Sequence, residues 1–121
     1  MFDRAKDIVT RIFDLKVNNL DVQDGQSISF WVDNKYTFIL DKREDGGILL
    51  SLRLELLPYM YSDFKHMLEA CAYKNGNRLS FSVGYYKDHM YLMHIINEDE
   101  LLQLDNIIQD FINMYEGIRS K

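Results

Sequence analysis

The sequence predicts a single α+β domain, in which an antiparallel sheet packs against helices. Apolar and polar residues alternate in several short stretches, as is typical of strands that are buried on one face. Other stretches carry apolar residues at helical spacing, and the chain of 121 residues has the usual length of one domain. We expect the element order α-βββ-α-ββ-α within one domain, residues 1–121.

The first predicted helix begins near the chain start, where Asp3 can serve as its N-cap. Ala5, Ile8, Val9 and Ile12 then follow at helical spacing, which predicts a helix as far as about residue 15 or 16. The next segment, VNNLDVQDGQ, is rich in Asn, Asp and Gly, and this composition predicts a loop.

Two strands are predicted in SISFWVDNKYTFIL, with a tight turn at residues 33–35 between them. Along the first strand Trp31 points to one face, and the other face carries three apolar residues. These are Ile28, Phe30 and Val32. The second strand is expected from Tyr36 to Leu40. Short turns join consecutive strands, so an antiparallel meander is expected.

The third predicted strand covers residues 48–57 and carries a ladder of alternating leucines. These are Leu50, Leu52, Leu54 and Leu56, and we expect them in the core. Apolar residues out of phase with this pattern are surplus to one core. They are Trp31, Ile39, Leu49 and Leu57. Surplus apolar surface indicates an oligomer or binding interface.

A second helix is predicted from Ser62 to the Asn75-Gly76 pair, which is a good C-terminal signal. Two strands should follow around a turn at residues 87–89, the first of them starting near Leu79. Asn97 and Glu100 have the spacing of a capping box before the last helix. The apolar face of that helix is expected to comprise Leu101, Leu104, Ile107, Ile108, Phe111, Ile112 and Tyr115.

Composition excludes several classes of protein. The 14 Lys and Arg residues against 19 Asp and Glu residues give a net charge of −5, which argues against nucleic-acid binding. The single cysteine allows no intrachain disulfide, and no stretch has the unbroken apolar core of a signal peptide or of a membrane span. We therefore expect a cytoplasmic protein.

No set of residues indicates a particular reaction, a cofactor or a metal. None of the pairs among His66, His89 and His94 has the i, i+4 spacing of a helical metal site. Cys71 lies five residues after His66, about 140° around the helix, so a nucleophile and base pair is not expected. The acidic residues 98–100 suit the positive end of a helix dipole. Together with Asp105, Asp110 and Glu116, they form either a solvated face or a surface that steers a basic partner.

The element order, together with three stretches, resembles the class I chaperones of bacterial type III secretion, which have the Tir-chaperone-like fold. The stretches are ILLSLRLELLP at residues 48–58, FKHMLEACAYKNGNRLSFSVGYY at residues 64–86 and MYLMHII at residues 90–96. The same topology occurs in the YbjN family, which leaves a YbjN-like regulatory protein-binding domain as the alternative.

The resemblance implies a cytoplasmic bacterial homodimer without enzymatic activity, ATP or metal. Such a chaperone binds the unfolded N-terminal segment of a secreted effector and keeps it soluble and competent for secretion, through apolar grooves and strand addition. The implied effector-binding residues are Ile8, Ile12, Phe13, Phe30, Trp31, Val32, Tyr36, Phe38 and Leu49. The implied dimer interface comprises Phe64, Met67, Leu68, Cys71, Leu79, Phe81 and Val83. One sheet face must pack on helices, so some of the first group must be core.

Overall fold

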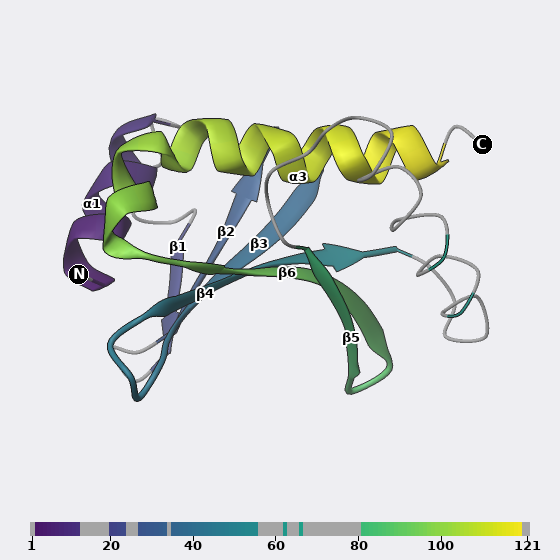
Figure 1. The fold of residues 1–121 in the computed structure, drawn as a ribbon, viewed down its shortest axis with the longest axis horizontal. Coiled ribbons are helices and arrows are strands. Elements are labelled where there is room, and N and C mark those ends of the chain that lie inside the picture. The colour runs from purple at the N-terminus through teal and green to yellow at the C-terminus, as the bar shows by residue number, and fades with distance from the viewer. Residues whose placement is uncertain are drawn as a thin grey trace.

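The computed structural model describes residues 2–12, 20–23, 27–33, 35–55, 62, 66 and 81–119. Its helices and strands form an α+β domain, as expected (Figure 1). They are α1 (Phe2–Ile12), β1 (Leu20–Gln23), β2 (Ser27–Val32), β3 (Tyr36–Lys42), β4 (Ile48–Leu54), β5 (Ser82–Tyr86), β6 (His89–Ile96), the 3-10 helix η3 (Glu98–Gln103) and α3 (Leu104–Arg119). Ser62 and His66 are helical, as predicted, and the rest of the predicted second helix lies outside the described residues.

The strands form one antiparallel sheet of six strands in the order β1-β2-β3-β4-β6-β5. The meander of β2, β3 and β4 confirms the prediction for residues 27–54. β6 pairs with β4 in the middle of the sheet, and its hairpin partner β5 lies at the edge. β4 and β6 are thus the strands through which the two halves of the chain meet.

β1 corrects the prediction of a loop over residues 17–26. Its four residues pair with β2, placing Leu20 opposite Phe30 and Val22 opposite Ile28. The segment has the alternation of a strand, but it is short and flanked by Asn, Asp and Gly, which concealed it. Main-chain pairing with β2 decides the structure here, because so short a segment gains little from the propensities of its own residues.

Several further boundaries differ from the predicted ones. β3 continues to Lys42 instead of Leu40, and β5 begins at Ser82 instead of near Leu79. α1 begins at Phe2, so Asp3 lies in its first turn and is not the N-cap. β4 ends at Leu54, because the backbone N–H of Glu55 donates to the Tyr115 hydroxyl at 3.0 Å. The last helix starts as a 3-10 helix over residues 98–103 and becomes an α-helix at Leu104.

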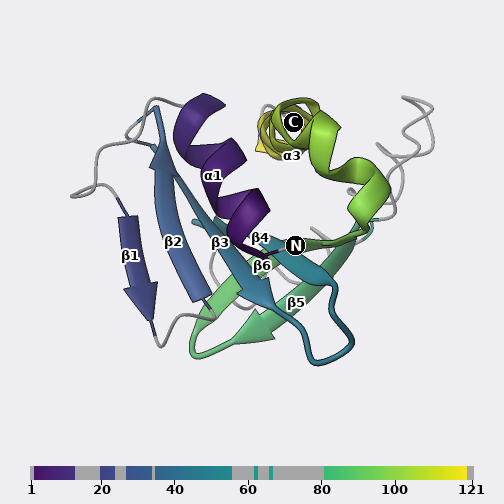
Figure 2. The ribbon, with the colours of Figure 1, turned by 90° about the vertical axis from the view of Figure 1, so that its left-hand side faces the viewer.

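Both α1 and α3 lie on one side of the sheet, so the core is sandwiched between helices and strands (Figure 2). The side chains that alternate on that side are almost wholly buried, as predicted for Leu50, Leu52 and Leu54 of the leucine ladder; Leu56 lies outside the described residues. The buried side chains include Ile28, Phe30, Phe38, Leu40, Leu50, Leu52, Leu54, Met90 and Leu92. All seven apolar residues predicted for the last helix are buried beneath it. Phe38 lies at the centre, with its ring 5.6 Å from that of Phe30 and 5.9 Å from that of Phe111.

Polar contacts attach both ends of the last helix to the sheet. At its start, Glu100 accepts a hydrogen bond from the Asn97 backbone N–H at 3.0 Å, which confirms the predicted capping interaction. The other carboxylate oxygen of Glu100 lies 2.9 Å from Nε2 of His94, a buried residue of β6. Near its end, the Tyr36 hydroxyl donates to Glu116 at 2.7 Å, and Lys35 lies 3.2 Å from the same oxygen.

Two of the acidic residues predicted to form a solvated or steering face therefore have internal partners. Glu100 and Glu116 fix α3 to the sheet. Glu98, Asp99 and Asp105 are exposed, in agreement with the prediction. The acidic surface of this helix is accordingly concentrated at its first turns.

We predict that Phe38→Ala lowers the free energy of unfolding by about 3–5 kcal/mol, because it leaves a cavity between two other rings. Urea unfolding followed by far-UV circular dichroism measures this value. Leu102→Ala is the control, since Leu102 is 78% exposed and its truncation should change stability by less than about 0.5 kcal/mol. Equal effects of the two substitutions would contradict the assigned core.

We predict a pH-dependent contribution from Tyr36. Burial raises the pKa of its hydroxyl above the usual 10.0, and the hydrogen bond to Glu116 raises the pKa further. Neutral Tyr36 therefore stabilises the fold fully below pH 10, and this stabilisation is lost as the pH rises through the higher pKa of the folded state. Tyr36→Phe should cost about 1–2 kcal/mol at pH 8, and its difference from the parent should shrink above pH 10.

The measurement for Tyr36 is urea unfolding of both proteins at several pH values between 7 and 11. Tyr86→Phe is the matched control, because Tyr86 is 64% exposed, and it should unfold as the parent does throughout. A difference between Tyr36→Phe and the parent that grows above pH 10 would contradict the predicted sign.

Candidate functional site

The sheet has a second face, which points away from α1 and α3 (Figure 2). Because side chains alternate along a strand, the register brings the remaining residues of β2, β3, β4 and β6 together on this outer face. One row across the sheet runs through Ser29, Ile39, Ser51 and Met93. Trp31 and Ile95, which are 42% and 44% exposed, also lie on the outer face. Three of the four apolar residues predicted as surplus, Trp31, Ile39 and Leu49, thus lie on one surface, and Leu57 lies outside the described residues.

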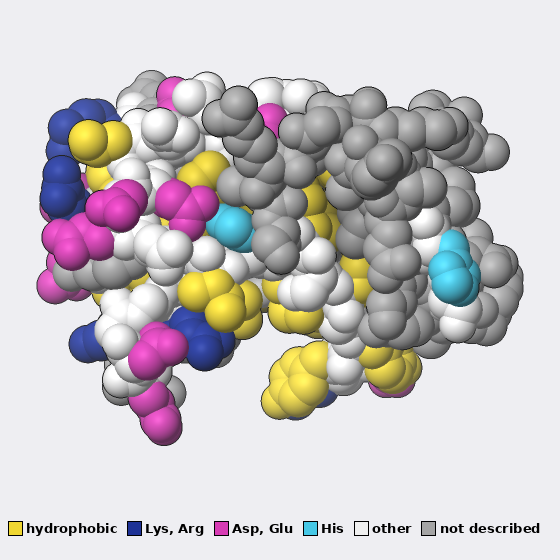
Figure 3. Space-filling model, in the orientation of Figure 1, with side chains coloured by type: hydrophobic (Ala, Val, Ile, Leu, Met, Phe, Trp, Pro, Cys, Tyr) yellow, Lys and Arg dark blue, Asp and Glu magenta, His cyan; other side chains and the backbone are white. Residues whose placement is uncertain are grey.

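The outer face is hollowed into a trough with a volume of about 530 Å³. We call it the sheet trough; it is lined by Ser27, Ser29, Ile39, Asp41, Leu49, Ser51, Tyr86, Lys87, Tyr91 and Met93. The β3–β4 turn and the β5–β6 hairpin both project from the sheet on the side opposite α3 (Figure 1). The space-filling view shows a recess between these two projections (Figure 3).

The β5–β6 hairpin supplies one wall of the sheet trough. Its two turn residues, Lys87 and Asp88, have positive φ angles of 48° and 66°, as in the two-residue turns that match the twist of paired strands. The Tyr85 hydroxyl donates to Asp88 at 3.1 Å, and the Lys87 ammonium lies 5.3 Å from the centre of the Tyr86 ring. These contacts hold aromatic side chains at the tip of the hairpin.

Gly84 of β5 leaves space for Met93, which forms part of the floor of the sheet trough. A Cβ atom at Gly84 would lie 2.5 Å from the terminal methyl group of Met93. The absence of a side chain on β5 therefore lets Met93 lie flat across the neighbouring strand. A larger residue would displace the tip of Met93 and reshape the trough.

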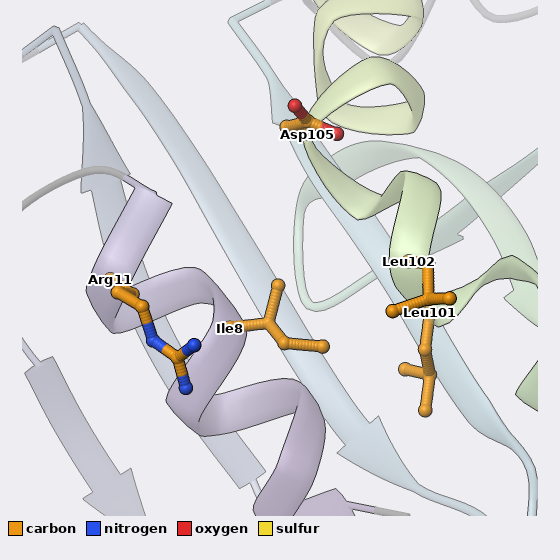
Figure 4. Close-up of a pocket in the computed structure, with 5 residues that line it drawn as sticks. All are labelled: Ile8, Arg11, Leu101, Leu102 and Asp105. Carbon is orange, nitrogen blue, oxygen red and sulfur yellow. The ribbon is translucent and has the colours of Figure 1, made fainter.

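A second hollow, of about 410 Å³, lies between α1 and the start of the last helix. We call it the helix hollow; it is lined by Ile8, Arg11, Leu101, Leu102 and Asp105. Ile8 projects from α1 towards Leu101, and the charged residues lie at the rim (Figure 4). Leu102 is 78% exposed beside it, so this hollow also offers apolar surface to solvent.

The two outermost strands offer a third mode of binding. β1 and β5 end the strand order, and among the described residues neither pairs with a strand on its outer side. Such edges carry unpaired backbone N–H and C=O groups, which can receive an additional strand. The sheet thus combines apolar recesses with edges that a polypeptide segment could extend.

The described residues show little that suggests catalysis. Among them, no group of three or more His, Cys, Asp or Glu side chains could hold a metal ion. The buried His94 and the half-buried Glu100 hydrogen-bond to each other, and Glu100 also caps the start of the last helix. In the described part of the chain, no helix is long and apolar enough to cross a membrane.

The residues implied as effector-binding separate into two groups. Phe30, Val32, Tyr36 and Phe38 are buried under the helices, so they have no surface to offer in this conformation. Trp31 and Leu49 lie on the outer face, with Leu49 lining the sheet trough, and Ile8 lines the helix hollow. The Ile12 side chain and Phe13 lie outside the described residues.

Most of the implied dimer interface also lies outside the described residues. This part comprises Phe64, Met67, Leu68, Cys71 and Leu79. Phe81 and Val83 are described and are partly buried against the core. The centre of the Phe81 ring lies 4.8 Å from that of the Phe111 ring, so Phe81 packs against the last helix of its own chain. A dimer interface remains a prediction.

Sequence reasoning did not identify the sheet trough. Strand alternation places Ile39, Leu49 and Met93 on one face, and this signal was present in the sequence. Asp41 follows the same alternation but lay beyond the predicted end of its strand at Leu40. The contributions of the hairpin residues Tyr86 and Lys87 could not be read from the sequence, because they depend on how far the sheet twists. Only the three-dimensional path of β5 and β6 brings that hairpin opposite β2 and β3.

Comparison with solved structures shows a shared fold. The chain is similar to a chain of the HopA1–SchA chaperone–effector complex, with a TM-score of 0.69 and 14% sequence identity. The match covers 98% of this chain and 92% of the other. This supports the predicted chaperone-like α+β fold. No protein-family model matches the sequence, and the search of curated proteins gave no match.

We predict that acrylamide quenches the fluorescence of Trp31, the only tryptophan, in the folded protein. The residue is 42% exposed on the outer face, so the quencher can reach its ring. The measurement compares quenching in buffer, in urea and for free N-acetyltryptophanamide. Emission that resists quenching until urea unfolds the chain would contradict an open outer face.

Proposed function

We propose that this protein is a type III secretion chaperone that binds the unfolded N-terminal segment of a secreted effector and keeps it soluble and competent for secretion. The observation that carries the proposal is the shared fold over 98% of the chain with a chain from a chaperone–effector complex. The exposed apolar residues of the outer face and the helix hollow support it, because a soluble domain seldom leaves such surface unused.

The proposed binding is passive and relies on extended contact. An unfolded segment loses conformational entropy when it becomes ordered, so a stable complex needs a large area of contact. Here the helix hollow, the sheet trough and the strand edges lie on different parts of one small domain. A segment that runs over several of them can combine buried apolar side chains with main-chain hydrogen bonds.

We propose further that the protein acts as a homodimer in the bacterial cytoplasm and is not an enzyme. A dimer doubles the number of recesses that one bound segment can reach. Of the implied interface residues, Val83 belongs to the edge strand β5 and Phe81 directly precedes it, at a place where a second copy could approach. This part of the proposal depends on the family resemblance of residues 64–86.

Light scattering after size exclusion tests the dimer directly. We expect a mass near twice that of the 14.4 kDa chain. Val83→Lys should shift the mass towards that of the monomer, because a charge at a buried apolar interface is costly. Ser82→Lys, on the neighbouring exposed position, is the matched control and should remain dimeric. A parent protein that is strictly monomeric at all concentrations would contradict the dimer.

Chemical crosslinking in the source bacterium, followed by mass spectrometry, tests the partner. We expect a secreted protein whose N-terminal segment, made alone, is disordered by NMR and becomes protected from hydrogen exchange when this protein is added. Binding should also keep that segment soluble. A partner that binds only through a folded domain would contradict the proposal and would favour the YbjN-like regulatory alternative.

A further inference from the structure

The sheet trough carries two charged side chains, Asp41 of β3 and Lys87 of the β5–β6 turn. Within the described part of the chain, neither makes an ion pair of the kind that joins Lys35 to Glu116 or Arg43 to Asp45. Asp41 is half-buried, and Lys87 makes a cation–π contact with Tyr86. Both charges are thus available to groups that enter the trough.

These charges belong to opposite walls. Asp41 lies beside Ser27 and Leu49 in the register of the central strands, whereas Lys87 lies at the tip of the hairpin that projects from the sheet. The floor between them is formed by apolar side chains of three different strands. They are Ile39, Leu49 and Met93. The nearby Ser51 is only 5% exposed, which shows how deeply the floor is recessed.

The shape of the trough suits a single extended chain better than a second folded domain. Its volume of about 530 Å³ falls within the usual range for sites that enclose a ligand, roughly 300–1,000 Å³. A stable interface between two folded proteins buries about 800 Å² on each side. Here the β3–β4 turn and the β5–β6 hairpin project on either side of the recess and would hold such a surface away (Figure 3).

An extended chain also matches the lining chemically. Its side chains alternate in direction, so every second residue can point to the apolar floor. A basic residue at one end of the stretch can then reach Asp41, and an acidic residue at the other end can reach Lys87. Since the lining contains one charge of each sign, it disfavours a stretch whose flanking charges are both positive or both negative.

We propose that the sheet trough binds a short extended stretch of the partner polypeptide, in which apolar residues are flanked by one basic and one acidic residue. This rests on the proposed function and adds to it the place and the charge pattern of one bound segment. The basic residue pairs with Asp41, the acidic residue pairs with Lys87, and the apolar residues cover Ile39, Leu49 and Met93.

Three fluorescein-labelled peptides test this proposal by fluorescence anisotropy. They share a centre of alternating leucine and serine and differ only at their ends, which carry lysine and glutamate, two lysines, or two glutamates. We expect the mixed-charge peptide to bind about three- to tenfold more tightly than the other two, as exposed ion pairs contribute modestly. The preference should decline at 0.5 M salt, because screening weakens such pairs.

Charge-reversal variants test which wall of the sheet trough binds which end of the peptide. Asp41→Lys makes both walls positive, so the two-glutamate peptide should now bind most tightly. Lys87→Glu makes both walls negative and should favour the two-lysine peptide. Glu44→Lys and Lys42→Glu are the matched controls, because both residues are exposed and outside the trough, and they should preserve the original order of affinities. Circular dichroism verifies that each variant is folded, and Asp41→Asn provides a milder variant.

Each result decides the proposal. An equal affinity for all three peptides, or control variants that change the order as much as the trough variants do, would overturn it, since net charge alone would then explain the binding. If none of the peptides binds while the effector segment identified by crosslinking still does, the trough assignment fails and the proposed function stands. If neither binds, both fail.

Discussion

The packing of the last helix across one face of the sheet is the contact on which the rest of the structure depends. The Phe111 ring meets Phe38 and Phe81 beneath α3, and these contacts join residues from both halves of the sheet. Polar attachments at either end, through Glu100 and Glu116, fix the direction of the helix. Because this helix and α1 occupy the same side, the opposite side of the sheet remains open (Figure 2).

Much of this arrangement could be predicted from the sequence, because it follows from local periodicity. Alternation in β2 and β4 and helical spacing in α3 were sufficient to assign their buried faces. The prediction did less well where long-range contacts decide. β1 pairs with β2 along its whole length, and β4 stops where the Tyr115 hydroxyl binds the Glu55 amide. The alternation in β1 is too short to identify it, and Tyr115 lies 60 residues from Glu55.

The same distinction applies to the candidate site. The sequence indicated a surplus of apolar residues out of phase with the core. Because side chains alternate along a strand, Trp31, Ile39 and Leu49 lie on the outer face. It could not indicate which of the implied binding residues were core, so Phe30 and Phe38 were included with them. It also could not show the trough, whose second wall comes from a hairpin that is distant in sequence and brought close by the twist of the sheet.

The alternation of side chains along each strand has a consequence for how such a protein can change over generations. Residues that face the helices form the core and so determine whether the chain folds. Their neighbours on the same strands are more exposed and contribute less to folding. Substitutions on the open side can therefore accumulate while the buried side is held constant. A fold shared at 14% identity is compatible with this freedom, and it would let one scaffold acquire new binding preferences by repeated small changes to a single surface.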